Sequence, residues 1–305
     1  MTSIDVIVPT WKGRELLAGC LDHLAAETTQ HTVFVADNAS GDGTVEMLRE
    51  RFPAVRVLEL GDNLGFGRAI NEAARAGSGE LIVLVNNDVE SEPGFLAAIA
   101  APFTDPQVGM VAGMTTIPGS GLVDGFGIEL DPTLAAHNRM RGERPEPVSG
   151  KLAVPSGGAA AYRRSAFEAA GGFDERLFAY GEDLDLGLRL LAAGWTCAAA
   201  SGARAAHLGG ATVGIDSPWQ RRLSGFARGY LLRRYGVLRT RYALRALAFE
   251  AITVAWGLIR HRTTVPLRSR LSGWRAGRGE HRPIATGALN DAIGWREALR
   301  RLRAR

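Results

Sequence analysis

The sequence predicts an α/β fold in which helices flank a mostly parallel central sheet, followed by a basic helical extension. The first observation is that short apolar segments alternate with segments of helical spacing, a pattern typical of βαβ units. These apolar segments are residues 4–8, 32–36, 55–60 and 81–85. The second is that Leu81–Val85 is apolar at every position, which indicates a strand buried on both faces of a parallel sheet. The third is a change of charge after residue 216.

The first half of the chain supplies three strand–helix units. Pro9 ends the first strand, and leucines at helical spacing predict a helix over residues 15–26. The second strand ends at Asp37, and the loop behind it leads to Thr44, which can cap the next helix. A loop with two glycines then separates the third strand from a helix over residues 68–76.

The pattern is less regular after the fourth strand. A helix is expected over residues 93–101 and a short strand over residues 108–112. Residues 115–155 are rich in Gly and Pro, which indicates an irregular wall over a site. A helix begins at Glu182, and residues 195–201 predict a last strand.

The composition argues against several classes of protein. Cys20 and Cys197 lie far apart and outside any C-x-x-C motif, so we expect two reduced thiols in a core. The chain enters its first strand at once, without the basic and apolar regions of a signal peptide. The longest apolar-leaning segment, residues 243–259, contains Arg245 and Glu250, so we predict no membrane-spanning helix.

The charge is unevenly distributed along the chain. Residues 1–216 contain 16 basic and 28 acidic side chains, whereas residues 217–305 contain 20 and 4. In the basic segment arginines interleave with aromatic residues, which suits a surface of anionic lipids. We therefore expect residues 217–305 to dock on a membrane surface. Helix packing or a homo-oligomer contact is the alternative, and no nucleic-acid-binding module is recognisable.

Polar residues follow two of the predicted strands. Ligands of open α/β sheets bind beyond the carboxyl ends of the strands. Asp37 could accept a hydrogen bond from a nucleobase or a ribose there, and Asn86-Asn87-Asp88 could meet a ligand or a hard metal ion. The alternative for both groups is turn chemistry or helix capping. A dinucleotide-binding fold is excluded because the turn after the first strand lacks G-x-G-x-x-G.

Two further groups suggest anion binding and proton transfer. Arg68 begins a helix behind Gly65 and Gly67, and free amide groups with a guanidinium suit a diphosphate. Glu182, Asp183 and Asp185 form the first turn of another helix. A carboxylate there could act as a general base, although the helix dipole alone also favours acids at this position.

Taken in order, these motifs resemble those of family 2 glycosyltransferases with the GT-A fold. They are Pro9-Thr10, the segment from Val35 to Thr44, the segment from Asn63 to Asn71, Asn86-Asn87-Asp88, the Gly-Gly-Phe-Asp-Glu segment from Gly171, and the segment from Glu182 to Arg189. The similarity covers roughly residues 3–210 and is greatest to bacterial rhamnosyltransferases of cell-wall and surface-polysaccharide assembly.

The resemblance implies a domain over residues 1–216, with a donor-binding half at 1–114 and an acceptor and catalytic half at 115–216. In the donor-binding half it implies donor contacts by Pro9, Thr10, Asp37, Asn63, Gly65, Arg68, Asn86, Asn87 and Asp88. In the other half it implies acceptor-side positions at Gly157, Gly158, Glu182, Asp185 and Trp195. Asp183 matches the catalytic base of the family.

The metal site departs from the usual family pattern. Asn86 and Asp88 occupy the D-x-D positions, so an amide replaces the commonest acid at the first of them. One carboxylate fewer weakens metal binding, which makes a second ligand such as His207 plausible for Mg²⁺ or Mn²⁺. A lone histidine is more often structural, and His207 matters only if the fold brings it beside Asp88, which sequence spacing cannot show.

The implied reaction is a single inverting displacement. The favoured donor is dTDP-L-rhamnose, and the acceptor is a hydroxyl of a saccharide or of a polyprenyl-diphosphate-linked saccharide. The alternatives are a galactosyl, galactofuranosyl or N-acetylhexosaminyl transferase that uses a UDP-sugar, and a catalytically silent nucleotide-sugar-binding scaffold. We expect a cytoplasmic protein that is peripheral at the inner face of the plasma membrane.

Overall fold

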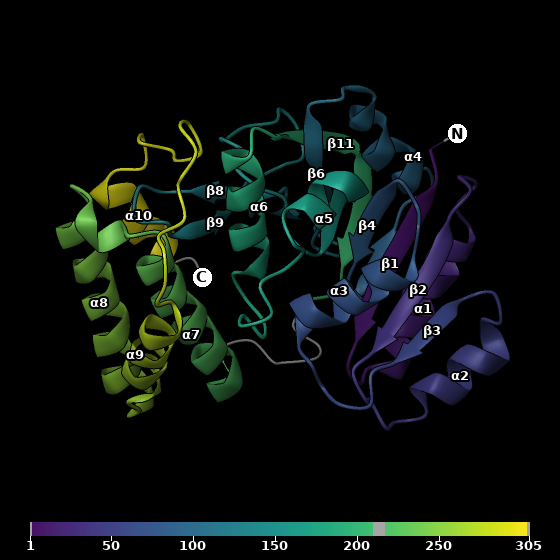
Figure 1. Ribbon diagram of the computed structural model, residues 1–305, viewed down its shortest axis with the longest axis horizontal. Helices are drawn as coiled ribbons and strands as arrows, with labels where there is room; N and C mark the ends of the chain where they lie inside the picture. Colours follow the sequence, from purple (N-terminus) through teal and green to yellow (C-terminus); the bar gives the residue numbers. More distant parts are fainter. Residues whose placement is uncertain (1, 210–216, 304–305) are drawn as a thin grey trace.

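The computed structural model describes residues 2–209 and 217–303, and it shows a mixed α/β fold (Figure 1). Its strands are β1 (Ile4–Thr10), β2 (Thr32–Asp37), β3 (Arg56–Glu59), β4 (Leu81–Val85), β5 (Val89–Ser91), β6 (Val108–Thr116), β7 (Val123–Gly125), β8 (Ile128–Leu130), β9 (Ala136–Asn138), β10 (Ala159–Arg163) and β11 (Thr196–His207).

The helices alternate with the first strands and then dominate the end of the chain. They are α1 (Arg14–Ala25), α2 (Thr44–Arg51), α3 (Phe66–Ala76), α4 (Phe95–Ala100), α5 (Arg164–Ala169), α6 (Glu182–Ala192), α7 (Pro218–Arg234), α8 (Ala243–His261), α9 (Val265–Ala276) and α10 (Trp295–Arg303), with 3₁₀ turns η1 (Ala101–Thr104) and η2 (Val237–Arg239).

The central sheet has the strand order β3-β2-β1-β4-β10-β6-β11-β5, with β7 added beside β6. Strands β3, β2, β1 and β4 are parallel, as predicted, and every residue of β4 is buried. Strand β10 runs antiparallel between β4 and β6, so the sheet is more mixed than expected. Strand β10 is not among the predicted strands. Its alanines are small and buried, which fits a strand squeezed between two neighbours.

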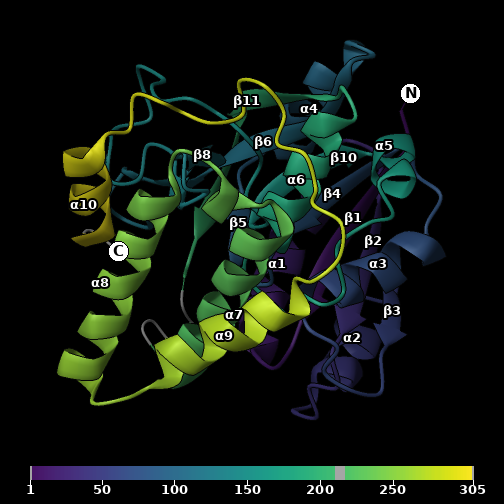
Figure 2. The same ribbon diagram turned by 60° about the vertical axis from the view of Figure 1, so that its left-hand side comes forward.

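The sheet separates two hydrophobic layers because successive side chains of a strand point to opposite faces. Ile7, Phe34 and Leu84 contribute to the layer under α3 and α6, whereas Val8 and Val85 contribute to the layer under α1 and α4. Figures 1 and 2 show helices on both faces of the sheet. The irregular wall predicted over residues 115–155 contains the short strands β7, β8 and β9.

The basic extension is helical, as predicted, and it shares the core of the sheet domain. Ala227, Tyr230 and Leu231 of α7 belong to the same hydrophobic cluster as α6 and the sheet. Helices α7 and α9 cross so closely that a Cβ added at Gly229 would lie only 2.0 Å from the carbonyl oxygen of Arg270. In the part of the chain that is described, no helix is long and apolar enough to cross a membrane.

Candidate active site

The carboxyl ends of β1, β2 and β3 bring three loops together. The amide of Asn38 donates to the carbonyl of Thr10 (2.9 Å), and the amide of Leu64 donates to the side chain of Asn38 (3.0 Å). Asn63 accepts from the amide of Gly65 (3.1 Å). These bonds hold the predicted donor-binding loops in one place, beside the buried Pro9 and Thr10.

Asp37 is buried at the end of β2 and organises the loop that follows it. Its carboxylate accepts from the amide of Ser40 (3.3 Å) and from the Ser40 hydroxyl. That hydroxyl oxygen in turn accepts from the amide of Lys12 (2.8 Å). Asp37 therefore couples the loop after β2 to the loop after β1, and the turn-forming alternative describes part of its role.

The residues Asn86, Asn87 and Asp88 after β4 do different things. The amide group of Asn87 donates to the Thr10 hydroxyl (3.1 Å) and the Lys12 carbonyl (3.4 Å), so it supports the loop after β1. Asn86 and Asp88 each have a buried Oδ1 atom that finds no hydrogen-bond partner among the described residues. Unpartnered buried oxygens are costly unless a ligand or ion satisfies them.

The fold brings His207 to Asp88. Strand β11 pairs antiparallel with β5 and sets His207 opposite Val89, so that Nε2 of His207 lies 3.4 Å from Oδ1 of Asp88. On the other side of the ring, Nδ1 lies 2.7 Å from Oδ2 of Asp124. Hydrogen bonding to Asp124 and the nearby Asp88 carboxylate raise the pKa of His207 to about 9.

Asp124 is a site residue that the sequence did not predict. It lies in β7 within the weakly periodic segment and also pairs with Arg141 (3.3 Å). The hydrogen bond with His207 lowers the pKa of Asp124 below its usual value, against the effect of burial. A carboxylate that holds one nitrogen of a histidine orients the other nitrogen toward a metal or a ligand. No local pattern marks Asp124, so only its contact with His207 identifies it.

A cavity of about 90 Å³ opens in front of these groups. Its walls come from β6, β7, β9, β10 and β11 and from the segments that follow β4 and precede β10: Asn86, Gly113, Thr115, Asp124, Gly125, Asn138, Ser156, Gly158, Ala159 and His207. Three or more His, Cys, Asp or Glu side chains able to hold a metal are not grouped anywhere in residues 2–209 and 217–303. Asp88 and His207 nevertheless offer oxygen and nitrogen ligands that suit Mg²⁺ or Mn²⁺, and Oδ1 of Asp88, which accepts no hydrogen bond and faces Nε2 of His207 at 3.4 Å, fits such an ion.

Helix α6 begins beside the Gly157-Gly158 backbone and presents Glu182 and Asp183. The carboxylate of Asp183 accepts from the amides of Leu184 (2.7 Å) and Gly157 (3.4 Å). Gly158, the next residue, lies against the side chain of Asn86. Burial raises the pKa of Asp183, although the two amides oppose that shift. Burial and the neighbouring Asp183 raise the pKa of Glu182 well above its usual value.

The glycine loop before α3 is shaped by a contact with the segment before α6. Gly65 has a φ angle of 84°, and a Cβ there would lie 2.3 Å from the carbonyl oxygen of Phe178. The amide of Phe66 donates to that same oxygen (2.8 Å). The close approach of Phe178 thus requires glycine at residue 65. Arg68, in the first turn of α3, is half-exposed and lies 3.5 Å from Glu175.

The sequence that forms this site matches a known protein family. The family model for glycosyl transferase family 2 matches residues 5–171, more than half of the chain. The chain is a family 2 glycosyltransferase. It is 33% identical over 211 residues to the N-acetylglucosaminyl-diphospho-decaprenol L-rhamnosyltransferase of Mycobacterium tuberculosis, covering 61% of this chain and 69% of that enzyme. O-antigen biosynthesis protein RfbC of Myxococcus xanthus is 32% identical over 211 residues, covering 63% of this chain and 16% of that protein.

Solved structures show that the glycosyltransferase has the GT-A fold predicted from its sequence. A mannosyltransferase from Pyrobaculum calidifontis in complex with GDP-Man and Mn²⁺ has a TM-score of 0.56 at 19% identity, covering 90% of this chain and 86% of that one. GalNAc-T7 with UDP, GalNAc and Mn²⁺ has a TM-score of 0.60 at 14% identity, with coverage of 79% and 52%. At these identities the likeness is one of fold.

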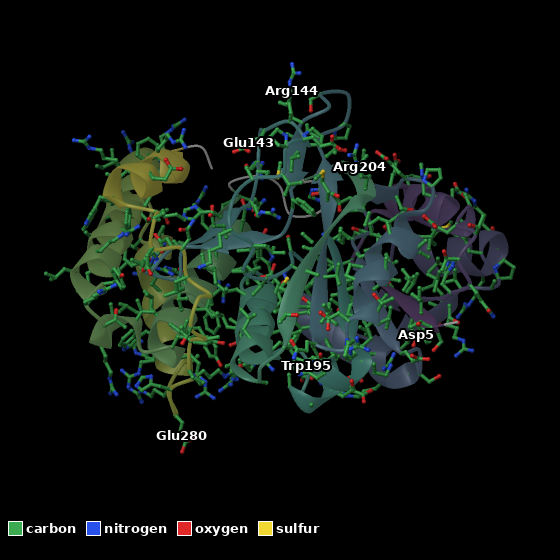
Figure 3. All side chains as sticks on the ribbon, turned by 90° about the horizontal axis from the view of Figure 1, so that it is seen from above. Asp5, Glu143, Arg144, Trp195, Arg204 and Glu280 are labelled. Atoms are coloured by element: carbon green, nitrogen blue, oxygen red, sulfur yellow. The ribbon has the colours of Figure 1, made fainter. Side chains whose placement is uncertain are left out.

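The structure places two of the expected acceptor-side residues away from this site of the glycosyltransferase. Trp195 precedes β11 and packs on Gly109, next to the start of β6 and therefore at the amino end of that strand. Figure 3 shows it on the same side as Asp5, near the start of β1. Trp195 lies too far from the carboxyl edge to contact a ligand there.

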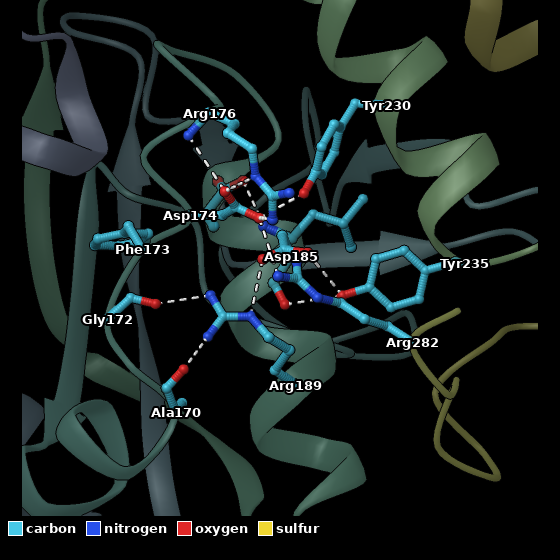
Figure 4. A network of polar contacts seen from close by, with 12 residues as sticks. Ala170, Gly172, Phe173, Asp174, Arg176, Asp185, Arg189, Tyr230, Tyr235 and Arg282 are labelled. Atoms are coloured by element: carbon cyan, nitrogen blue, oxygen red, sulfur yellow. Dashed lines mark hydrogen bonds and ion pairs between the residues drawn. The ribbon is translucent and has the colours of Figure 1, made fainter. Parts of the chain in front are cut away.

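Asp185 lies in the first turn of α6 but points away from the cavity. Its fully buried carboxylate contacts Arg189 (2.9 Å), the hydroxyl of Tyr235 (2.9 Å) and the guanidinium of Arg282. Figure 4 shows that these partners come from α6 and from the basic extension. Asp185 therefore anchors the helix of the glycosyltransferase to its C-terminal region.

Proposed function

We propose that this glycosyltransferase moves L-rhamnose from dTDP-L-rhamnose to a hydroxyl of a lipid-linked saccharide, with inversion at the anomeric carbon. The observation that carries the proposal is that the Gly157-Gly158 backbone contacts Asp183 through the Gly157 amide, while Gly158 and His207 line one cavity and His207 faces Asp88. The mycobacterial relative is a rhamnosyltransferase named for a decaprenol-linked acceptor, and this supports both the sugar and the lipid-linked acceptor.

The residues of this chain would divide the work as follows. Asp183, held by the amides of Leu184 and Gly157, takes the proton of the acceptor hydroxyl as that oxygen attacks the anomeric carbon. Its raised pKa makes it a stronger base than an ordinary aspartate. The loops after β1 and β2, tied together through Asp37 and Asn87, would hold the nucleotide of the donor.

Asp88 and His207 would hold a divalent ion, with Asn86 beside them. Such an ion supplies positive charge that stabilises the departing nucleoside diphosphate. Asp124 would keep the His207 ring turned toward the ion through its hydrogen bond to Nδ1. The solved GT-A structures in complex with Mn²⁺ support this assignment by analogy of fold. A lipid-linked acceptor would bring the enzyme to the inner face of the plasma membrane.

The experiment is a calorimetric titration of the full chain with dTDP-rhamnose, UDP-galactose, UDP-galactofuranose, UDP-N-acetylglucosamine and GDP-mannose, each with and without Mn²⁺ or Mg²⁺. We expect selective, metal-dependent binding of dTDP-rhamnose. In the Asp88→Ala variant, donor affinity in the presence of metal should fall by about tenfold or more. Asp22→Ala removes an exposed carboxylate on α1 and is the matched control, with donor affinity unchanged.

The other results would change the proposal in defined ways. Selective binding of a UDP-sugar would keep the mechanism and replace rhamnose with a galactosyl, galactofuranosyl or N-acetylhexosaminyl group. Binding without any dependence on metal, or equal binding by the Asp88→Ala variant, would refute the metal assignment. Binding of none of these donors would refute the donor assignment, and donor binding without any sugar transfer would favour the catalytically silent scaffold, which the presence of Asp183 at the site argues against.

A further inference from the structure

Helix α8 has a continuous apolar face that no other described element covers. Figures 1 and 2 show α8 at the edge of the molecule, with α9 and α10 beside it and its outer side open. The exposed fraction reaches 81% for Leu244, 62% for Trp256 and 79% for Ile259. The large apolar side chains exposed on this helix are Leu244, Leu247, Ile252, Trp256, Leu258 and Ile259, and we call this set the α8 face.

No charged residue interrupts the α8 face. Between Leu244 and Ile259 the chain has only two charged residues, Arg245 and Glu250, and both point inward. Arg245 pairs with Asp131 (3.0 Å), and Glu250 lies between two arginines of α7 and α9, at 2.6 Å from each. An exposed apolar patch that contains six large side chains usually marks an interaction surface.

Arginines lie at one end of the α8 face. Arg260 and Arg262 lie at the end of α8, and Arg268 lies in the first turn of α9. All three are exposed, and none makes an ion pair within residues 2–209 or 217–303. The two helices contain one acidic residue, the inward-pointing Glu250, so this surface carries positive charge that no neighbouring acid balances.

The apolar α8 face and the exposed arginines beside it together favour a lipid surface over a second copy of the chain as the partner. A contact between two copies of this surface would bring arginines together without any exposed acid to neutralise them. An anionic membrane supplies both phosphates for the arginines and an apolar layer for the α8 face. Since α8 cannot cross a membrane, it would lie in the plane of the interface.

We propose that the α8 face docks the enzyme on an anionic lipid surface, with Trp256 and Ile259 entering the apolar layer and the arginines at the α8–α9 turn meeting the headgroups. Docking would place the enzyme where a lipid-linked acceptor lies, and in that respect the inference rests on the proposed function. The surface itself is separate from the site, because its residues belong to α8 and α9, and the cavity is lined by the sheet domain.

The test is flotation of the full chain with vesicles. Vesicles of phosphatidylcholine with phosphatidylglycerol should carry the protein upward, and vesicles of phosphatidylcholine alone should carry much less. The variant Trp256→Ser/Ile259→Ser should lower partitioning by at least about tenfold. Arg260→Gln/Arg268→Gln should lower it by about fivefold per arginine and reduce its sensitivity to salt. Val148→Ser alters an exposed apolar residue outside α8 and should leave partitioning unchanged.

Each contrary result has a defined meaning. Equal binding by the Trp256→Ser/Ile259→Ser variant, or no binding of the wild-type chain to anionic vesicles, would overturn the proposal. Sedimentation velocity would show whether the α8 face instead joins two copies, since that dimer would be lost in the same variant. Donor titration of the variant without vesicles should match the wild type. Weaker donor binding by the variant would show that the substitutions affect the proposed donor site. Normal donor binding with lost flotation would show that they affect membrane docking alone.

Discussion

A glutamine in place of Arg282 would remove a guanidinium that holds two buried carboxylates at once. Arg282 lies in the segment between α9 and α10, far along the chain from α6. One of its nitrogens contacts Asp185, and another lies 3.0 Å from Asp174 (Figure 4). The Arg282 side chain is only 18% exposed, and the two carboxylates are 0% and 6% exposed, so solvent screens these pairs weakly.

The magnitude follows from what remains after the substitution. Removing one partner of a buried ion pair costs about 3–5 kcal/mol when the other charge is left alone. Here each carboxylate keeps another arginine, Arg189 for Asp185 and Arg176 for Asp174. We therefore expect Arg282→Gln to lower the free energy of unfolding by about 2–3 kcal/mol.

Urea denaturation of the full chain, followed by circular dichroism, would measure this loss. Arg278→Gln removes the same charge from an exposed side chain of the same segment, and its effect should stay within about 0.5 kcal/mol. A double-mutant cycle with Asp185→Asn should give a coupling energy of at least about 1 kcal/mol. The reasoning fails if Arg282→Gln is no more destabilising than Arg278→Gln, or if its effect adds to that of Asp185→Asn without coupling.

Further predictions concern the base and the loop before α3. Asp183→Asn should lower kcat by about 10²–10⁴-fold with donor affinity nearly unchanged, and normal turnover in a transfer assay would exclude Asp183 as the base. Because burial raises the pKa of Asp183, and that of Glu182 beside it, kcat should fall as the pH drops through a midpoint above the ordinary aspartate value of about 3.9. A pH–rate profile that stays flat to pH 4 would contradict that assignment. Gly65→Ala should destabilise the fold by about 2–4 kcal/mol, because a Cβ there meets the carbonyl of Phe178. Gly61→Ala, at a positive φ in open space, should cost only about 1 kcal/mol in the same unfolding assay.

The parallel part of the sheet could be predicted because burial leaves a local record in the sequence. Strand β4 is buried on both faces, and five consecutive apolar residues report that burial directly. The turn residues at its end then locate Asp88 at the carboxyl edge, where ligands of α/β folds bind. The helix that begins with Glu182 and Asp183 could be predicted equally well, since acidic residues followed by apolar residues at helical spacing mark the start of a helix.

The reversed strand and the partners of the site residues could not be read in this way. A strand direction is set by how the chain returns to the sheet, and the alanine-rich β10 has the same local pattern in either direction. His207 meets Asp88 only because β11 pairs with β5, and Asp124 joins them only because β7 lies beside β6. Such contacts join residues far apart in the chain, and spacing records nothing of them.

The basic extension shows the same division most clearly. The sequence alone determined that residues 217–305 are rich in arginine and helical, because composition and periodicity are local properties. Only the tertiary structure determined which arginines pair with buried carboxylates. Arg228 and Arg270 hold the buried Glu250, and Arg282 holds Asp185, whereas Arg260 and Arg268 remain on the surface. An arginine in a sequence has the same charge in both places, and only the packing around it determines whether a buried carboxylate lies within reach.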